Sequence, residues 1–148
     1  MEMHVEPVTS LAQIEAVRII YNDNLESLAT KPLPRRLYHE QIKWWLELDK
    51  SKVRLWLHYD TAGYRLIGFS MLTARGDCHT PIFAIRKEEQ GLGYARHFIE
   101  HYLKAAGTPL RGEQLRSNEA IVYLNAEYGW EVLASYNGVD DLYHPGVK

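Results

Sequence analysis

The chain has 148 residues, of which 46% are hydrophobic and 24% are charged, values that predict one domain over residues 1–148 and exclude a disordered chain. Its formal net charge of −2 argues against broad binding of nucleic acid, which depends on clustered Lys and Arg, but leaves a local basic patch open. The N-terminus shows no signal peptide and no apolar run approaches the ~20 residues that span a bilayer, so we expect a cytoplasmic protein that does not enter a membrane.

The N-terminal quarter of the chain predicts a strand and a helix. Residues 3–8 fit a short strand, and Ser10 is a suitable N-cap for the helix that follows it. Within this helix Leu11, Ile14 and Val17 fall on one face at helical spacing. The two prolines of the KPLP segment, residues 31–34, end the helical pattern.

A second helix and a hairpin follow. The helix is expected over residues 38–48, with Ile42, Trp45 and Leu46 on its buried side. The hydrophobic period then changes from helical to alternating over residues 53–59. A turn separates that run from a second one over residues 64–72, so the pair predicts a β-hairpin.

The second half of the chain alternates strands and helices. A strand over residues 78–85 precedes the glycine-containing stretch QGLGYA, residues 90–95, and an apolar stripe predicts a helix from there to Ala106. The remaining elements are a strand over 110–116, a helix over 118–128 closed by a glycine, and two strands over 130–136 and 139–143. The order β-α-α-β-β-β-α-β-α-β-β predicts an α/β fold with a mixed sheet.

The QGLGYA stretch joins a strand to the start of a helix. The first amides of a helix have no internal acceptor and lie at the positive end of its dipole, so a glycine loop here can bind an anion. A tight turn that needs glycine dihedrals explains the stretch equally well. A P-loop is excluded because Tyr94-Ala95 stands where Lys-Ser/Thr is required, and the dinucleotide fingerprint needs a third glycine.

Two motifs together resemble the GNAT (Gcn5-related) N-acetyltransferase family. Residues 90–95 match the acetyl-CoA loop pattern Gln/Arg-x-x-Gly-x-Gly/Ala, and residues 118–130, NEAIVYLNAEYGW, resemble the Asn-led helix that ends in Gly-Phe. The resemblance covers nearly the whole chain, although the first ~50 residues match only in the order of elements. It implies a mostly antiparallel central sheet flanked by helices, and transfer of an acetyl group from acetyl-CoA to a primary amine in a ternary complex.

The resemblance also implies where acetyl-CoA binds. The strand that ends at Ile85 would splay from the strand near 110–116, and the cofactor would insert between them. Backbone amides of the loop would hold the pyrophosphate, backbone groups of the strand would pair with the pantetheine arm, and two asparagines would contact the cofactor. The implied residues are Gln90, Gly91, Leu92, Gly93, Tyr94 and Ala95 in the loop, Phe83 and Ile85 in the strand, and Asn118 and Asn125 in the helix.

The catalytic groups are less complete than the cofactor loop. Asn125 stands where many members carry a tyrosine that acts as general acid, and an amide does not give up a proton, so water is left to protonate the leaving thiolate. His79 lies where some members carry a catalytic glutamate, and its imidazole suits a general base, although an ordinary strand histidine is an equally simple interpretation. By strand alternation Asp77 would share the face of His79 and either orient it or attract a cationic acceptor. Cys78, the only cysteine, would point to the other face as a small apolar side chain.

The acceptor amine is expected to meet the first two helices. Tyr21, Asn22, Asn24 and Trp44 are the candidate substrate-binding residues; of the adjacent Trp44 and Trp45, one is expected to pack in the core and the other to line a groove or an interface. The carboxylates Asp23, Glu26, Asp140 and Asp141 are expected to be solvated. His97 and His101, four residues apart on the long helix, are expected on an exposed face, with no third ligand for a metal.

Three functions remain open from the sequence. The first is N-acetylation of a small molecule such as an amino sugar, a polyamine or a modified nucleoside. The second is acetylation of a protein or an aminoacyl-tRNA, against which the modest charge weighs. The third, suggested by Asn125, is a non-catalytic module that binds acyl-CoA. A homodimer through the terminal strands would be typical of the resembled family.

Overall fold

The computed structural model describes residues 2–25, 34–62 and 64–147. The predicted order of helices and strands is confirmed, whereas Lys31 to Leu33 and Glu26 lie outside the described residues. No helix in the described ranges is long and apolar enough to cross a membrane. The elements are β1 (Met3–Pro7), α1 (Leu11–Asp23), α3 (Tyr38–Glu47), β2 (Val53–Asp60), β3 (Arg65–Arg75), β4 (Cys78–Ile85), the 3-10 turn η1 (Lys87–Glu89), α4 (Ala95–Ala106), β5 (Leu110–Leu115), α5 (Glu119–Glu127), β6 (Glu131–Tyr136) and β7 (Val139–His144).

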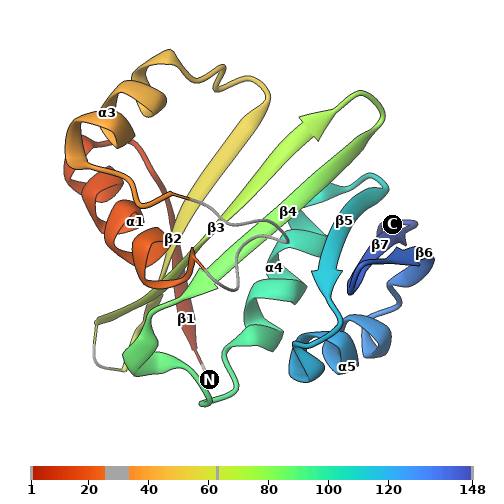
Figure 1. Ribbon diagram of the computed structural model, residues 1–148. Coiled ribbons are helices and arrows are strands. Elements are labelled where there is room, and N and C mark those ends of the chain that lie inside the picture. Colours follow the sequence, from red (N-terminus) through yellow and green to blue (C-terminus); the bar gives the residue numbers. More distant parts are fainter. Residues whose placement is uncertain (1, 26–33, 63, 148) are drawn as a thin grey trace.

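The strands form one seven-stranded sheet in the order β1-β2-β3-β4-β5-β7-β6. Neighbouring strands are antiparallel except for β4 and β5, which run parallel. Within the described residues this parallel pair is in register only at His79 and Leu110. Beyond that point the two strands diverge, as Figure 1 shows.

Helices cover both faces of the sheet. Ile14, Val17 and Ile20 of α1, with Trp45 of α3, pack on one face. The other face is covered by α4, whose buried residues Phe98, Ile99 and Tyr102 follow the apolar stripe predicted from the sequence. In Figure 1, α1 and α3 lie together against the first strands, away from α5.

The prediction for α3 is wrong at Leu46, which is 66% exposed. Gln41 is buried instead, four residues before the buried Trp45 on the same helical face. Its side-chain oxygen accepts a hydrogen bond from the guanidinium of Arg36 at 3.2 Å. A buried amide is tolerated where such a partner is available, so a polar residue occupies an inward position that the hydrophobic pattern did not reveal.

The prediction that His97 and His101 lie on an exposed face is also wrong. Both are half-buried, because α4 lies over the strand that carries His58. His58 is fully buried; its Nδ1 is 2.8 Å from His97 Nε2 and its Nε2 is 2.6 Å from Ser70 Oγ. The ring of His101 meets the ring of His58 edge-on at 4.8 Å, and its buried Nε2 has no hydrogen-bond partner among the described residues.

Burial keeps these three histidines neutral. Desolvation, with the neighbouring His101 and His97 adding to it, lowers the pKa of His58 to about 2. Desolvation is also the main cause that lowers the pKa of His101 to about 4 and the pKa of His97 below its usual range. Although three imidazoles meet here, no group of metal-binding side chains able to hold an ion is present in the part of the chain that the structure describes.

Candidate active site

The divergence of β4 and β5 opens a cavity of about 270 Å³ in the sheet. Its walls are residues 81–85 of β4 and residues 112–113 of β5. Tyr102 of α4, Ile121 and Asn125 of α5, and the N-cap residue Asn118 of that helix also line it. Strand residues that face a gap lack a ladder partner on that side, so their backbone groups can pair with a ligand. The splayed strands expected from the family resemblance are therefore present.

The glycine loop begins at the edge of this cavity, where Gln90 lines it. Gly91 and Gly93 have φ of 77° and 89°, the left-handed region that favours glycine, and a Cβ at either position would meet no atom within 4 Å. The loop therefore needs these glycines for its dihedrals, and its outer side is open. Tyr94, at the N-cap of α4, makes no side-chain hydrogen bond to the first turn of the helix. The first-turn amides of α4 lack the side-chain acceptor that usually satisfies them, which suits an anion.

Gln90 has a different place from the one expected. Its backbone N–H donates to the carbonyl of Lys87, so this amide is used inside the protein. Its side-chain Nε2 donates to Asn24 Oδ1 and to the carbonyl of Ile85, both at 3.0 Å. The expected role of the Gln90 amide as a pyrophosphate donor is thus corrected: the residue ties the loop to β4.

Asn24 belongs to the same contact and also lines the cavity. Its Nδ2 donates to the carbonyls of Ile20 and Ile85, at 2.8 and 3.1 Å. The carbonyl of Ile85 accepts from both Asn24 and Gln90, so both of its lone pairs are used. Of the backbone groups expected to pair with a pantetheine arm, Ile85 can contribute only its N–H. Phe83 lines the cavity and stacks on Phe98 at 5.2 Å.

The other loop and helix residues fall near the expected positions. Leu92 is exposed between the two glycines, and Ala95 begins α4. Asn118 lines the cavity and caps α5, since its Oδ1 accepts from the backbone N–H of Ile121 at 3.3 Å.

Asn125 is buried in the cavity wall and held by a chain of hydrogen bonds. Its Nδ2 donates to Gln114 Oε1 at 2.8 Å, and Gln114 Nε2 donates to Asp140 Oδ2 at 2.8 Å. Because a carboxylate only accepts, Asp140 fixes the orientation of both amides. Hydrogen bonds from Ser135, Gln114 and Arg116 lower the pKa of Asp140 and keep it ionised. The expectation that Asp140 is a solvated surface carboxylate is wrong.

His79 lies at the closed end of the gap, where β4 and β5 still pair. Its backbone N–H donates to the carbonyl of Pro109 at 2.9 Å, and its Nδ1 is 2.5 Å from Thr108 Oγ1. Desolvation, and secondarily the charge of Arg54, lower its pKa, so the ring is neutral near pH 7 and can accept a proton. The cavity lining begins two residues further along β4, at Pro81.

The expected pairing of Asp77 with His79 is corrected. Asp77 is exposed in the turn before β4 rather than in the strand, so strand alternation does not place it on the face of His79. Cys78 is half-buried, and its thiol donates to the carbonyl of Arg75 at 3.4 Å.

Three of the four expected acceptor residues contact a residue of the protein itself, Arg36, through its side chain or its backbone. The guanidinium carbon of Arg36 lies 5.0 Å from the ring centre of Tyr21 and 5.5 Å from that of Trp44. Asn22 Oδ1 accepts from the backbone N–H of Arg36, and Asn22 Nδ2 donates to its carbonyl. These residues anchor the segment before α3 and do not line the cavity. As predicted, one tryptophan of the pair, Trp45, packs in the core.

Sequence reasoning missed two aromatic residues of the site. Tyr102 and Trp130 line the cavity, and the indole N–H of Trp130 donates to the Tyr102 hydroxyl at 2.9 Å. Burial raises the pKa of Tyr102, so the phenol stays protonated. In the sequence Tyr102 is one member of an apolar helical stripe, which distinguishes it in no way from a core residue.

No family model matches this sequence, and no curated protein matches it. Solved structures do match the fold. The spermidine N-acetyltransferase from Vibrio cholerae, solved in complex with CoA and spermine, superposes with a TM-score of 0.83 at 18% identity, covering 97% of this chain and 95% of that one. A chimera of the Vibrio cholerae enzyme and hSSAT gives a TM-score of 0.79 at 17% identity over 98% and 96% of the two chains. At this identity the likeness shows the fold, and it confirms the fold expected from the family resemblance.

Proposed function

We propose that the protein is an acetyl-CoA-dependent N-acetyltransferase that acetylates a primary amine of a small molecule. The cavity between β4 and β5, with the uncapped start of α4 and its glycine loop at the edge, is the observation that carries this proposal. Such a site offers an anion-binding end and a narrow slot with free backbone groups, the two parts that a phosphate-bearing, amide-containing cofactor needs. The likeness to the Vibrio cholerae enzyme, whose structure holds CoA and spermine, supports the same choice and makes polyamines the first class of acceptor to test.

The residues present fit coenzyme A. Because Gly91 and Gly93 leave the outer side of the loop open, the amides from Gly91 to Ala95 would hold the pyrophosphate. Phe83 and the N–H of Ile85 would hold the pantetheine arm from the β4 wall, and Asn118 and Asn125 would contact it from the α5 wall. Acetyl-CoA would supply the thioester whose acetyl group is transferred.

The side chains then divide the remaining work. His79, neutral and anchored through Nδ1, would accept the proton of the attacking amine at Nε2, directly or through water. Asn125 would orient the cofactor but would give no proton, because an amide is not an acid and its Nδ2 is already held by Gln114. The leaving thiolate would therefore take its proton from water or from the acceptor amine.

Binding and turnover test this proposal separately. Calorimetry with CoA and acetyl-CoA should give saturable one-to-one binding, and absence of binding at millimolar cofactor would overturn the cofactor assignment. Thiol release should then be followed with spermidine, spermine, an amino sugar and a peptide amine as acceptors. Tight cofactor binding without turnover on any amine would instead favour a non-catalytic acyl-CoA-binding module.

The role of His79 predicts a change in pH dependence. In His79→Gln the rate should fall about 10²-fold or more, and the rise of the rate with pH that reports a histidine should disappear, while CoA affinity stays unchanged. The measurement is kcat against pH for both proteins, with exposed His39→Gln as the matched control. If the two pH profiles coincide, His79 has no part in proton transfer.

A further inference from the structure

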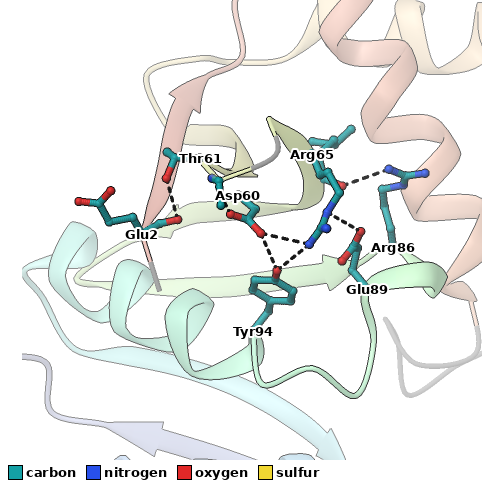
Figure 2. A network of polar contacts seen from close by, with 9 residues as sticks. Glu2, Asp60, Thr61, Arg65, Arg86, Glu89 and Tyr94 are labelled. Carbon is teal, nitrogen blue, oxygen red and sulfur yellow. Dashed lines mark hydrogen bonds and ion pairs between the residues drawn. The ribbon is translucent and has the colours of Figure 1, made fainter.

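A polar network joins the glycine loop to the hairpin of β2 and β3, as Figure 2 shows. At its centre is Arg65, the first residue of β3. Its Nη2 donates to Asp60 Oδ2 at 3.1 Å and to the Tyr94 hydroxyl at 3.2 Å, and its Nε lies 3.3 Å from Glu89 Oε1. The Tyr94 hydroxyl donates to the same Asp60 oxygen at 3.1 Å.

The two loop residues in this network stand on either side of the glycines. Glu89 ends η1, directly before Gln90, and Tyr94 directly follows Gly93. One guanidinium therefore holds both ends of the four-residue segment 90–93. Within the segment Gln90 is tied to Asn24 and to the carbonyl of Ile85, whereas the two glycines have open surroundings on their outer side.

The partners of Arg65 are buried although Arg65 itself is half-exposed. The side chains of Glu89 and Asp60 are 9% and 14% exposed, and Tyr94 packs with Ile67 and Phe98. Buried carboxylates need a compensating charge, and a planar guanidinium satisfies several acceptors with fixed geometry. Without Arg65, two carboxylates would remain beside a loop that has to accept phosphate.

We propose that Arg65 is a positioning residue for cofactor binding: it fixes the conformation of residues 90–93 through Glu89 and Tyr94 and offsets part of the negative charge of the two carboxylates behind the loop, without touching the cofactor. This inference rests on the proposed function, because it assigns the loop to the phosphates of coenzyme A. Arg65 should thus control affinity for the cofactor and leave chemistry at the other end of the cavity unchanged.

The test compares Arg65→Ala with Arg75→Ala, an exposed arginine at the far end of β3 that removes the same charge. CoA affinity by calorimetry should fall at least tenfold in Arg65→Ala and stay within twofold in the control. In the ligand-free protein, hydrogen exchange of the amides at 90–95 should accelerate only in Arg65→Ala. Arg65→Lys, which keeps the charge but lacks the planar fork, should recover part of the affinity.

Tyr94→Phe provides a second route if Arg65→Ala does not fold. It keeps the buried ring and removes one contact of the guanidinium, so it should weaken CoA binding less than Arg65→Ala. Adding it to Arg65→Ala should cause little further loss, because the two changes act on one network. Wild-type protein that fails to bind CoA would overturn the proposed function itself. Wild-type binding together with unchanged affinity and loop exchange in both variants would overturn only the role of Arg65.

Discussion

Replacing Gly68 by alanine is expected to destabilise the fold severely, although the change adds only one methyl group. Gly68 lies in β3, opposite Ile85 of β4, under the ring of Phe98. A Cβ at this position would lie 2.1 Å from the carbonyl oxygen of Ala84 and 2.9 Å from Phe98 Cζ. The first neighbour is backbone and cannot turn away, so β3 and β4 would have to separate where they support the cavity.

We expect Gly68→Ala to lower the free energy of unfolding by about 3 kcal/mol or more, at the upper end of overpacking effects. Urea unfolding followed by circular dichroism gives this value directly. Gly112→Ala is the matched control, because its Cβ would lie 3.7 Å from Trp130, an ordinary contact, and its stability should change by less than about 1 kcal/mol. Equal stability of Gly68→Ala and wild type would contradict the packing described for β3.

Mild acid is expected to lower the free energy of unfolding of the protein through its buried histidines. In the unfolded chain each histidine takes up a proton near pH 6.5, whereas His58 and His101 stay neutral in the fold down to about pH 2 and 4. Their contribution to the free energy of unfolding is therefore complete above pH 6.5, and it is lost progressively as the pH falls below that value. For fully buried His58 the loss approaches about 1.4 kcal/mol per pH unit below pH 6. Partial exposure makes the contributions of His97 and His101 smaller.

Charged neighbours have a smaller effect than burial on this pH dependence of stability. Arg54 lowers the pKa of His101 further, while Glu100 opposes the shift in the pKa of His97. The measurement is the free energy of unfolding in urea between pH 7.5 and 5, for wild type and for His58→Phe, which keeps a ring next to Phe98 but cannot titrate. In His58→Phe the slope of the unfolding free energy against pH should be lower by about 1.4 kcal/mol per pH unit, the equivalent of one proton. In exposed His4→Gln this slope should equal that of the wild type. Parallel curves for wild type and His58→Phe would exclude His58 as the source.

The elements of the fold followed from the sequence because each carries a local signal. The change from helical to alternating period located β2 and β3, and the glycine after Tyr128 located the end of α5. Local patterns say nothing about which faces meet across the sheet. His58 and His97 are 39 residues apart in the chain, and only the packing of α4 over β2 brings them together.

The site followed from the sequence to a similar extent. The loop and the gap were predicted, because glycine spacing and the Asn-led helix are local motifs. The use of Gln90 and Asn24 as ties was not predicted, because Gln90 meets Asn24 across 66 positions and Asn24 meets Ile85 across 61. Arg36 was missed for the same reason: nothing in its own segment shows that Tyr21 and Trp44 enclose it.

Because β4 and β5 pair at one register position only, each of these two strands has an unpaired edge inside the sheet. An exposed edge strand normally invites pairing with a strand of another molecule, which leads to aggregation. Here the two edges face each other across a narrow cavity walled by α5 and by the ring of Tyr102. By our proposal a slender extended molecule with amide groups enters and pairs with these edges, and it needs less room than a second polypeptide strand with side chains on both faces. The divergence that would make a binding slot would thus also disfavour pairing of its unpaired backbone with other copies of the chain.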